Sequence, residues 1–512
     1  MARGGIIGLL LAGSVIAAPA SAETLREALV KAYQTNPTIT GQRAAQRALD
    51  ENVPIARSAG LPAVNATGGF NNNLFAPSTD LAAQSNSLNS PQRQATGTTQ
   101  LSVPIYQGGG VRSSIRAAET RVEAGRFTLR GTESDLFSAT VGAYMDVIRD
   151  EAIVGLNRQN VKVLDVNLQA TKDRFQVGDL TRTDVAQSEA RLALAHGQLQ
   201  SAEAQLITSR ENYIRIVGSP PVDLRTPPAL PKLPASANAA VGEALNNNPT
   251  LQAAAKQRDA TRFDVTTAKS SRLPKLSVVV GGNYYNYLGS LGAGTGVQVA
   301  QSGTSATAGV ALTVPIFQGG RPAAQVRQAE ALRSQSIENE TSTERSVIAT
   351  TRSAYAVWQS SEQVIASSDT AVTANKLSLE GVRAENSVGS RTILDILNAE
   401  QELLNSEVTL VTARRDAYVA GFALLAAMGD AEAKDLGLDG GSLYDPVKNY
   451  DRVRNRFGDF GGDGEPTGVA PTTRNTPAQD ATVAAPLDPE FDTPPVDKNA
   501  PLTTGARTPG HH

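Results

Sequence analysis

The chain has no cysteine, three histidines, one tryptophan, and only 4% aromatic residues among its 512. Without cysteine, disulfides and every thiolate-based metal or catalytic site are excluded. His196 lies in a polar helical stretch, and His511 and His512 end the chain, so none of them has the spacing of metal ligands. Because no catalytic set of residues is present either, we expect a protein that is not an enzyme and binds no cofactor and no metal.

Charge of one sign and long apolar runs are also missing. The formal net charge is -3, which gives no reason to expect a nucleic-acid partner. After residue 22, no stretch is apolar enough for a transmembrane helix. Before it, Arg3 precedes an apolar run and the triplet Ala20-Ser21-Ala22, which predicts a secretory signal peptide cleaved between Ala22 and Glu23. A membrane anchor is the alternative, but the run is too short to span a bilayer.

What the chain does contain is an internal repeat. The stretch VPIYQGGG at 103–110 returns as VPIFQGG at 314–320, and other short motifs recur at an offset of 211 or 212 residues. The pairs are Asn36-Pro37-Thr38 with Asn248-Pro249-Thr250, Leu61-Pro62 with Leu273-Pro274, Tyr144 with Tyr355, Val177-Gly178 with Val388-Gly389, and Asp184 with Asp395. A constant offset indicates two copies of one structural unit. Each copy is predicted to run helix, strand, strand, long helix, turn, long helix.

The repeat and the composition suggest the domain limits. We expect a first repeat at 23–217, a proline-rich linker at 218–236 and a second repeat at 237–428. A segment at 429–460 is expected to dock on the body. The tail at 461–512 is rich in proline, glycine, threonine and aspartate, a composition typical of disorder.

Four segments show strand character: 61–70, 95–106, 276–288, and one that contains the alternating residues Ala308, Val310, Leu312 and Val314. Leu101, Val103 and Ile105 alternate with polar residues in the second of them. The strands are ~10 to 13 residues long, which suits tilted strands that span a bilayer. Known membrane barrels need at least about eight strands, so several chains would have to share one barrel. The alternative is a pair of hairpins packed on a soluble body.

Long helices fill most of the remaining sequence. The segment 111–176 lacks proline and predicts about 65 residues of helix, or roughly 100 Å. Further helices are expected at 182–217, 323–387 and 392–428. Large and small residues alternate at heptad spacing from Val185 to Tyr213 and from Ile396 to Leu424, which favours a coiled coil over an ordinary antiparallel helix hairpin without excluding the latter.

Glycines stand where each second strand meets a long helix. They are Gly108 and Gly109 in the first copy and Gly319 and Gly320 in the second. A phosphate-binding loop is excluded because no Lys-Ser/Thr pair follows. We therefore interpret them as the residues that bend the chain from strand into helix.

Together these features resemble the TolC family of bacterial outer-membrane channels, over about residues 23–460. The resemblance rests on the signal peptide, the repeated NPT and LP motifs, strands ending in VPI(Y/F)QGG, and two turns of the form VGxxxxxD. It implies an α+β membrane protein: a homotrimer with a twelve-stranded β-barrel, four strands per chain, continuous with a long α-helical coiled-coil barrel. The implied location is the outer membrane, in contact with its lipid, with the helical tunnel in the periplasm.

The same resemblance implies a passive exit duct for efflux or type I secretion. Its partners would be a periplasmic adaptor protein and an inner-membrane pump of the RND or ABC type. The adaptor would contact the tips at Val177, Gly178, Val388 and Gly389. The alternatives are a periplasmic coiled-coil scaffold without a pore and a substrate-specific porin, although a porin needs far more strands per chain.

A gate is implied at the same tips. Arg391 matches the family's gate arginine, Thr183 and Asp184 match its partners, and Asp395 matches a ring of entrance carboxylates. Two positions depart from the family pattern, because Asn386 replaces a tyrosine and Asn398 replaces a second aspartate. We therefore expect a weaker negative field at the mouth and an easier opening. The alternative is that Asp184, Arg391 and Asp395 are solvated turn and cap residues at helix starts.

Overall fold

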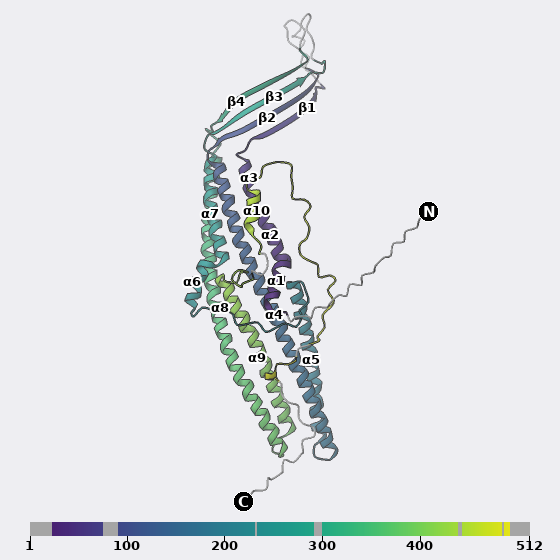
Figure 1. Ribbon diagram of the computed structural model, residues 1–512. Coiled ribbons are helices and arrows are strands. Elements are labelled where there is room, and N and C mark those ends of the chain that lie inside the picture. The colour runs from purple at the N-terminus through teal and green to yellow at the C-terminus, as the bar shows by residue number, and fades with distance from the viewer. Residues whose placement is uncertain are drawn as a thin grey trace, which may run out of the picture.

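The computed structural model describes residues 23–74, 91–230, 233–290, 300–438, 443–483 and 486–491. A four-stranded sheet forms one end of the elongated molecule, and long helices run from it to the opposite end (Figure 1). The predicted signal peptide, including Ala22, and the last residues, 492–512, lie outside the described residues.

The tandem repeat predicted from the sequence is confirmed by the order of the elements. The first copy contains α1 (Leu25–Thr35), α2 (Pro37–Asp50), α3 (Asn52–Ser58), β1 (Ala63–Asn72), β2 (Arg93–Gln107), α4 (Gly110–Gln176) and α5 (Arg182–Val217). The second contains α6 (Ala237–Asn247), α7 (Pro249–Ser270), β3 (Lys275–Asn286), β4 (Ser302–Thr313), α8 (Arg321–Ser387) and α9 (Ile393–Met428). A short helix α10 (Pro446–Val453) and a 3-10 turn η2 (Pro489–Phe491) follow.

The recurring Asn-Pro pair starts a helix and anchors it at the same time. The Asn36 side chain caps α2 by accepting a hydrogen bond from the Thr38 amide at 2.8 Å, and Pro37 occupies the first helical position, where no amide hydrogen is needed. The Asn36 amide group also donates to the Ile216 carbonyl at the end of α5, at 2.8 Å. Asn248 repeats this arrangement against Ala427 at the end of α9, at 2.9 Å.

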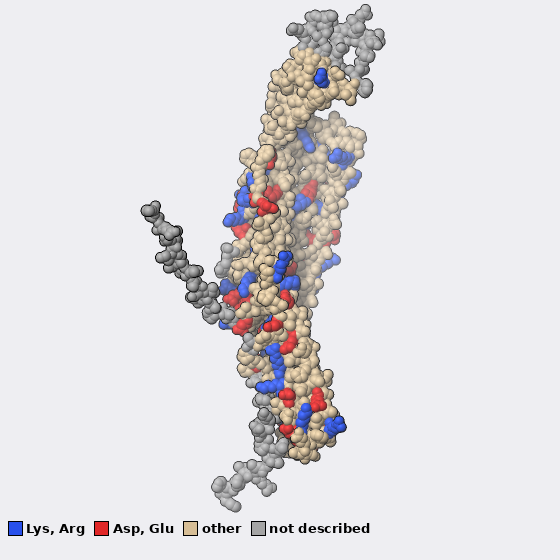
Figure 2. All heavy atoms as spheres, turned by 90° about the vertical axis from the view of Figure 1, so that its right-hand side faces the viewer, with Lys and Arg blue, Asp and Glu red and all other residues tan. Residues whose placement is uncertain are grey.

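The sheet is antiparallel in the order β1-β2-β3-β4, so β1 and β4 are its two edges. In its register, Ala63 faces Ser102, Val103 faces Val278, and Val278 faces Val310. Neither β1 nor β4 contains a charged residue. Figure 2 shows the consequence on one face of the molecule, where charged side chains gather over the helices and the sheet is almost free of them.

The four longest helices form two antiparallel pairs, α4 with α5 and α8 with α9. The heptad residues predicted for α5 and α9 form the inner seams of these pairs. Ala195, Leu206 and Tyr213 are buried on α5, and Leu403 and Leu410 are buried on α9. None of the helices in the described ranges has both the length and the apolar composition needed to cross a membrane.

The segment after α9 contacts the first copy. The Tyr444 amide donates to the Tyr33 hydroxyl at 3.1 Å, and the Asn449 side chain donates to Asp50 at 2.8 Å. These contacts hold α10 against α2.

The composition of the tail predicts disorder from residue 461, and the structure differs from this prediction. Residues 461–483 and 486–491 are described, and the second stretch ends in η2 with Phe491 almost fully buried. The physical reason lies in the helices, because arginines of α4 and α5 donate hydrogen bonds to carbonyl groups of this proline-rich segment. Composition alone does not show such partners.

Candidate functional site at the helix tips and the strand–helix junctions

The tip that joins α4 to α5 is closed by local hydrogen bonds. Gly178 adopts a left-handed conformation with φ of +85°, which reverses the chain after α4. The Thr181 side chain accepts from the Asp184 amide, and the Asp184 carboxylate accepts from the Thr181 amide at 2.9 Å, forming a capping box at the start of α5. Arg174 pairs with Asp179 across the turn, with 2.7 Å between Nε and Oδ2.

The tip that joins α8 to α9 has the same backbone and a different charge arrangement. Gly389 has φ of +80°, and Thr392 and Asp395 form the capping box of α9. Here the cation is in the turn and the carboxylate is on the helix end, because Arg391 Nε lies 2.7 Å from Glu385 Oε2. At the apex of each tip, Val177 and Val388 are about three-quarters exposed.

Among the described residues of one chain, no contact joins Asp184 to Arg391. Hydrogen bonds from the Thr181 side chain and amide lower the pKa of Asp184, and those from the Thr392 amide and side chain lower the pKa of Asp395. Both carboxylates therefore stay ionised, and within one chain both are helix caps. Thr183 is exposed in the first turn of α5.

The two asparagines that depart from the family pattern have partners. The Asn386 side chain donates to the Arg391 carbonyl at 2.7 Å and so braces its own turn. The Asn398 side-chain oxygen accepts from Arg191 Nη2 at 2.7 Å. Because Arg191 is on α5 and Asn398 is on α9, this hydrogen bond links the two helix pairs near their tips.

A second link was not predicted from the sequence. Glu400 on α9 is buried, and it accepts from the Asn167 side chain of α4 at 2.8 Å and from Arg383 of α8 at 3.1 Å. Burial raises the pKa of Glu400. Sequence gives no signal for this role, because the equivalent residue in the first copy, Glu189, is exposed and pairs with Lys172.

The two strand–helix junctions share one backbone and differ in what covers them. Gly108 and Gly109 have φ of +63° and +75°, and Gly319 and Gly320 have +58° and +80°, so the predicted bend is observed in both copies. A methyl group on Gly108 would lie 2.8 Å from Leu273 Cβ. A methyl group on Gly319 or Gly320 would meet nothing within 4 Å.

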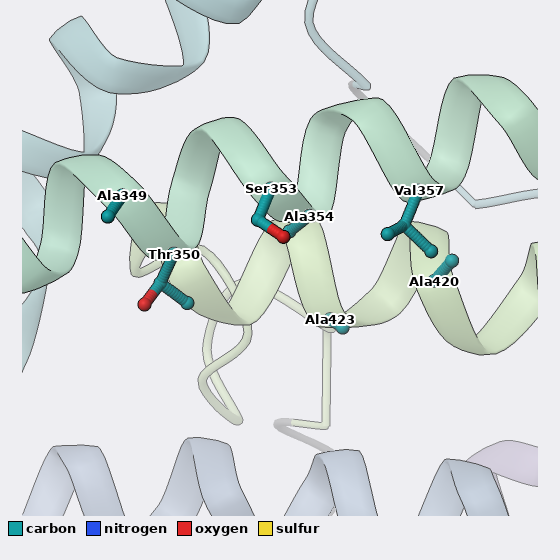
Figure 3. A pocket seen from close by; sticks show the side chains of 7 residues that line it. All are labelled: Ala349, Thr350, Ser353, Ala354, Val357, Ala420 and Ala423. Carbon is teal, nitrogen blue, oxygen red and sulfur yellow. The ribbon is translucent and has the colours of Figure 1, made fainter.

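The surroundings of the second junction are exposed as well. Ile316 and Phe317, which precede Gly319, are 94% and 87% exposed. Further along α8 and α9, a shallow groove is lined by side chains no larger than valine (Figure 3). They are Ala349, Thr350, Ser353, Ala354 and Val357 on α8, with Ala420 and Ala423 on α9.

The comparisons with known proteins agree with this architecture. The outer membrane efflux protein family matches residues 28–219 and 240–430, one match for each copy. The chain is 34% identical to the outer membrane efflux protein BepC of Brucella suis over 453 residues, which cover 88% of this chain and 94% of BepC. It is 27% identical to the outer membrane protein TolC of Escherichia coli over an alignment of 523 positions, which covers 99% of this chain and 98% of TolC.

Among solved structures, the CmeC outer membrane channel of Campylobacter jejuni superimposes with a TM-score of 0.68 at 16% identity, over 84% of this chain and 89% of that one. At that identity the likeness establishes the fold alone. The matches together define the class, and the chain belongs to the outer membrane efflux protein family. It is an outer-membrane exit duct for efflux or secretion, with its helical part in the periplasm, and the poreless scaffold is not favoured.

Proposed function

We propose that three copies of the chain assemble into one continuous duct, with a twelve-stranded barrel in the outer membrane and a helical tunnel below it. The observation that carries this proposal is the pair of open sheet edges, β1 and β4, at the two ends of an antiparallel order. An open edge presents unpaired backbone groups that seek another strand. Pairing β4 of one copy with β1 of the next continues the sheet, and three copies give twelve strands.

The junction glycines support the same assembly. Within the chain, Leu273 of the second copy, at the start of its Leu-Pro motif, packs over Gly108 of the first copy. Its repeat equivalent, Leu61, is 38% exposed, and the equivalent of Gly108, Gly319, is uncovered. When Leu61 of a neighbouring copy packs over Gly319, both residues are covered, and the contact is the same as that of Leu273 with Gly108 inside the chain. The exposed Ile316 and Phe317 are then buried at the same seam.

The tips form the periplasmic entrance in this arrangement. We propose that Arg391 leaves Glu385 to pair with Asp184 of a neighbouring copy when the entrance is closed, and that three Asp395 carboxylates surround the opening. A periplasmic adaptor docks at the exposed turns around Val177 and Val388, and an inner-membrane pump of the RND or ABC type drives the cargo. The duct itself performs no chemical reaction.

The first experiment measures the mass of the detergent-extracted mature protein by light scattering. A trimer is expected, which remains intact on a gel in unheated and in mildly heated samples, whereas a monomer in every detergent contradicts the shared barrel. The second measures conductance in planar bilayers. Arg391→Ser and Asp184→Ala are expected to raise the conductance, because each removes one side of the closing pair. Asp179→Ala is the matched control, since its ion pair stays within one tip, and equal effects of all three contradict the gate.

A further inference from the structure

The C-terminal residues 479–483 and 486–491 contact both helix pairs, and we call these two stretches the strap. In Figure 1, the yellow end of the described chain follows the helical body and ends beside α9. Its upper part lies on the α4/α5 pair, and its lower end reaches the α8/α9 pair. It therefore connects the two helix pairs above their tips.

The upper part of the strap is held by hydrogen bonds from arginines. Arg210 of α5 donates to the carbonyl groups of Asp480 at 2.8 Å and Thr482 at 2.9 Å. Arg158 of α4 donates to the carbonyl group of Ala481 at 2.8 Å. Hydrogen bonds from charged donors are roughly twice as strong as neutral ones, so three consecutive carbonyl groups are firmly fixed.

The lower end of the strap combines burial with charge. Phe491 is 3% exposed and belongs to an apolar cluster that also contains Leu156 of α4, Val372 of α8 and Leu410 of α9. Beside it, the Glu490 carboxylate accepts two hydrogen bonds from Arg414 of α9, at 3.0 and 3.1 Å. The Glu490 carbonyl group accepts a hydrogen bond from Lys376 of α8. Burial of a phenylalanine side chain among three helices is favourable, so this end of the strap has a fixed position on the helices.

Between these two anchors, Leu487 packs on α4 at a position that has no side chain. A Cβ on Gly155 would lie 3.0 Å from Leu487 Cδ1 and 4.0 Å from Leu487 Cβ. Gly155 thus leaves the space that the leucine occupies. The strap consequently contacts α4 and α5 at one end and α8 and α9 at the other.

We propose that the strap is a clamp that holds the α4/α5 pair against the α8/α9 pair and opposes their separation. The proposal rests on the proposed gate at the tips and adds to it that the entrance opens when these two pairs, whose tips carry Asp184 and Arg391, move apart. Release of Phe491 and Glu490 removes the contacts to α8 and α9 and leaves the arginine contacts to α4 and α5 in place.

The seat of the strap is tested by a designed cross-link. The chain has no cysteine, so Gly155→Cys with Leu487→Cys gives the only two thiols. The Cβ separation of 4.0 Å matches that of disulfides, about 3.5 to 4.5 Å. Rapid oxidation of the trimer in outer-membrane vesicles, followed by loss of maleimide labelling, is expected. The matched control is Gly142→Cys with Leu487→Cys, because Gly142 also lies on α4 but a Cβ there would meet nothing within 4 Å. This control variant is expected to keep both thiols free.

The clamp is then tested by conductance. The oxidised Gly155→Cys, Leu487→Cys channel is expected to stay closed longer, with dithiothreitol restoring the wild-type behaviour. Glu490→Ala with Phe491→Ala is expected to raise the open probability about tenfold, a common size of coupling between sites. Phe460→Ala is the matched control, since Phe460 is a fully exposed phenylalanine just before the tail.

The outcomes separate the clamp from the function on which it rests. A wild-type protein that never conducts overturns both. A conducting wild type whose strap cross-links no faster than the control, or whose conductance is the same with and without the Glu490 and Phe491 side chains, overturns the clamp alone.

Discussion

Helices α4 and α8 are equivalent in the repeat and equal in length at 67 residues, yet their surroundings differ. Twenty-seven residues of α4 are buried, against six of α8. Among the described residues, α4 lies between α5, α7, α9 and the three N-terminal helices, whereas α8 packs extensively only against α6, α7 and α9. The two copies of the repeat therefore differ, because α4 is enclosed by other helices and α8 has one side that no described helix covers.

Helix α8 exposes several apolar side chains among its many polar ones. Leu332, Val357 and Leu377 are each more than half exposed on it. The difference between the helices is what the proposed trimer requires, because a neighbouring copy would then cover the α8 side.

The largest effect is expected from the tyrosine that recurs in both helices. Tyr144 on α4 is fully buried, and its hydroxyl donates to the carbonyl groups of Glu23 and Arg225, 2.9 and 2.6 Å away. Tyr144→Ala is expected to lower the free energy of unfolding by about 4 kcal/mol, through the cavity and the unpaired carbonyl groups. Tyr355→Ala on the half-buried equivalent is expected to cost roughly 1 to 2 kcal/mol. Thermal unfolding followed by circular dichroism measures both.

Tyr144→Phe separates the two causes, because it keeps the ring and removes only the hydroxyl. It is expected to cost about 1 to 3 kcal/mol. If Tyr144→Ala and Tyr355→Ala prove equally destabilising, the contrast between the two helices does not hold in the assembled protein, and α8 is as well covered as α4.

The second prediction compares the junction glycines. Gly108→Ala places a methyl group against Leu273 and the Ser270 carbonyl oxygen, 2.8 and 2.9 Å away, at a positive φ. We expect Gly108→Ala to lower the free energy of unfolding by about 3 kcal/mol and to give little correctly folded chain. Gly319→Ala carries the same backbone strain, roughly 1 to 2 kcal/mol, with no clash inside the chain.

Assembly sharpens this comparison. If Leu61 of a neighbouring copy covers Gly319, then Gly319→Ala leaves a folded monomer that fails to form the heat-resistant trimer. The yield of folded chain and the yield of trimer are measured separately on the same preparation. A Gly319→Ala trimer as stable as the wild type argues against the proposed seam.

Much of this fold could be predicted from the sequence because its signals are local or repeated. The Asn36 and Asn248 caps, the glycine bends and the Thr181–Asp184 capping box each lie within a few residues, so a short pattern specifies each of them. The equal offset of the motifs then supplies the repeat. None of these signals shows which copy is enclosed, since burial depends on elements far away in the chain.

The contacts that join the helix pairs could not be predicted for the same reason. Glu400 meets Asn167 across 233 positions of sequence, and its equivalent Glu189 faces solvent. The strap escaped prediction because its own composition is that of a disordered segment. What orders it are Arg158 and Arg210, which read in sequence as ordinary solvated charges on a coiled coil.

The smallest of the three effects concerns a pair of equivalent positions on α5 and α9. His196 on α5 is exposed, whereas Glu407 on α9 is buried beneath the end of the strap. Burial raises the pKa of Glu407 from 4.5 to about 7, with the Lys376 ammonium, 3.9 Å away, opposing the shift. The folded state therefore holds a proton that the unfolded state has already released between pH 4.5 and 7.

The sign of the pH dependence follows from this raised pKa. The retained proton stabilises the folded state fully below pH 4.5, and this stabilisation is lost as the pH rises through about 7. At pH 8 the free energy of unfolding is therefore lower by roughly 2 to 3 kcal/mol than below pH 4.5. Glu407→Gln is expected to be more stable than the wild type at pH 8 and similar at pH 5, as shown by urea unfolding at both values. His196→Gln, on the exposed equivalent, is expected to leave this difference unchanged. In the Glu490→Ala, Phe491→Ala variant, Glu407 becomes more exposed, so the pH dependence should shrink, and a pH dependence of full size there means that the strap does not cover Glu407.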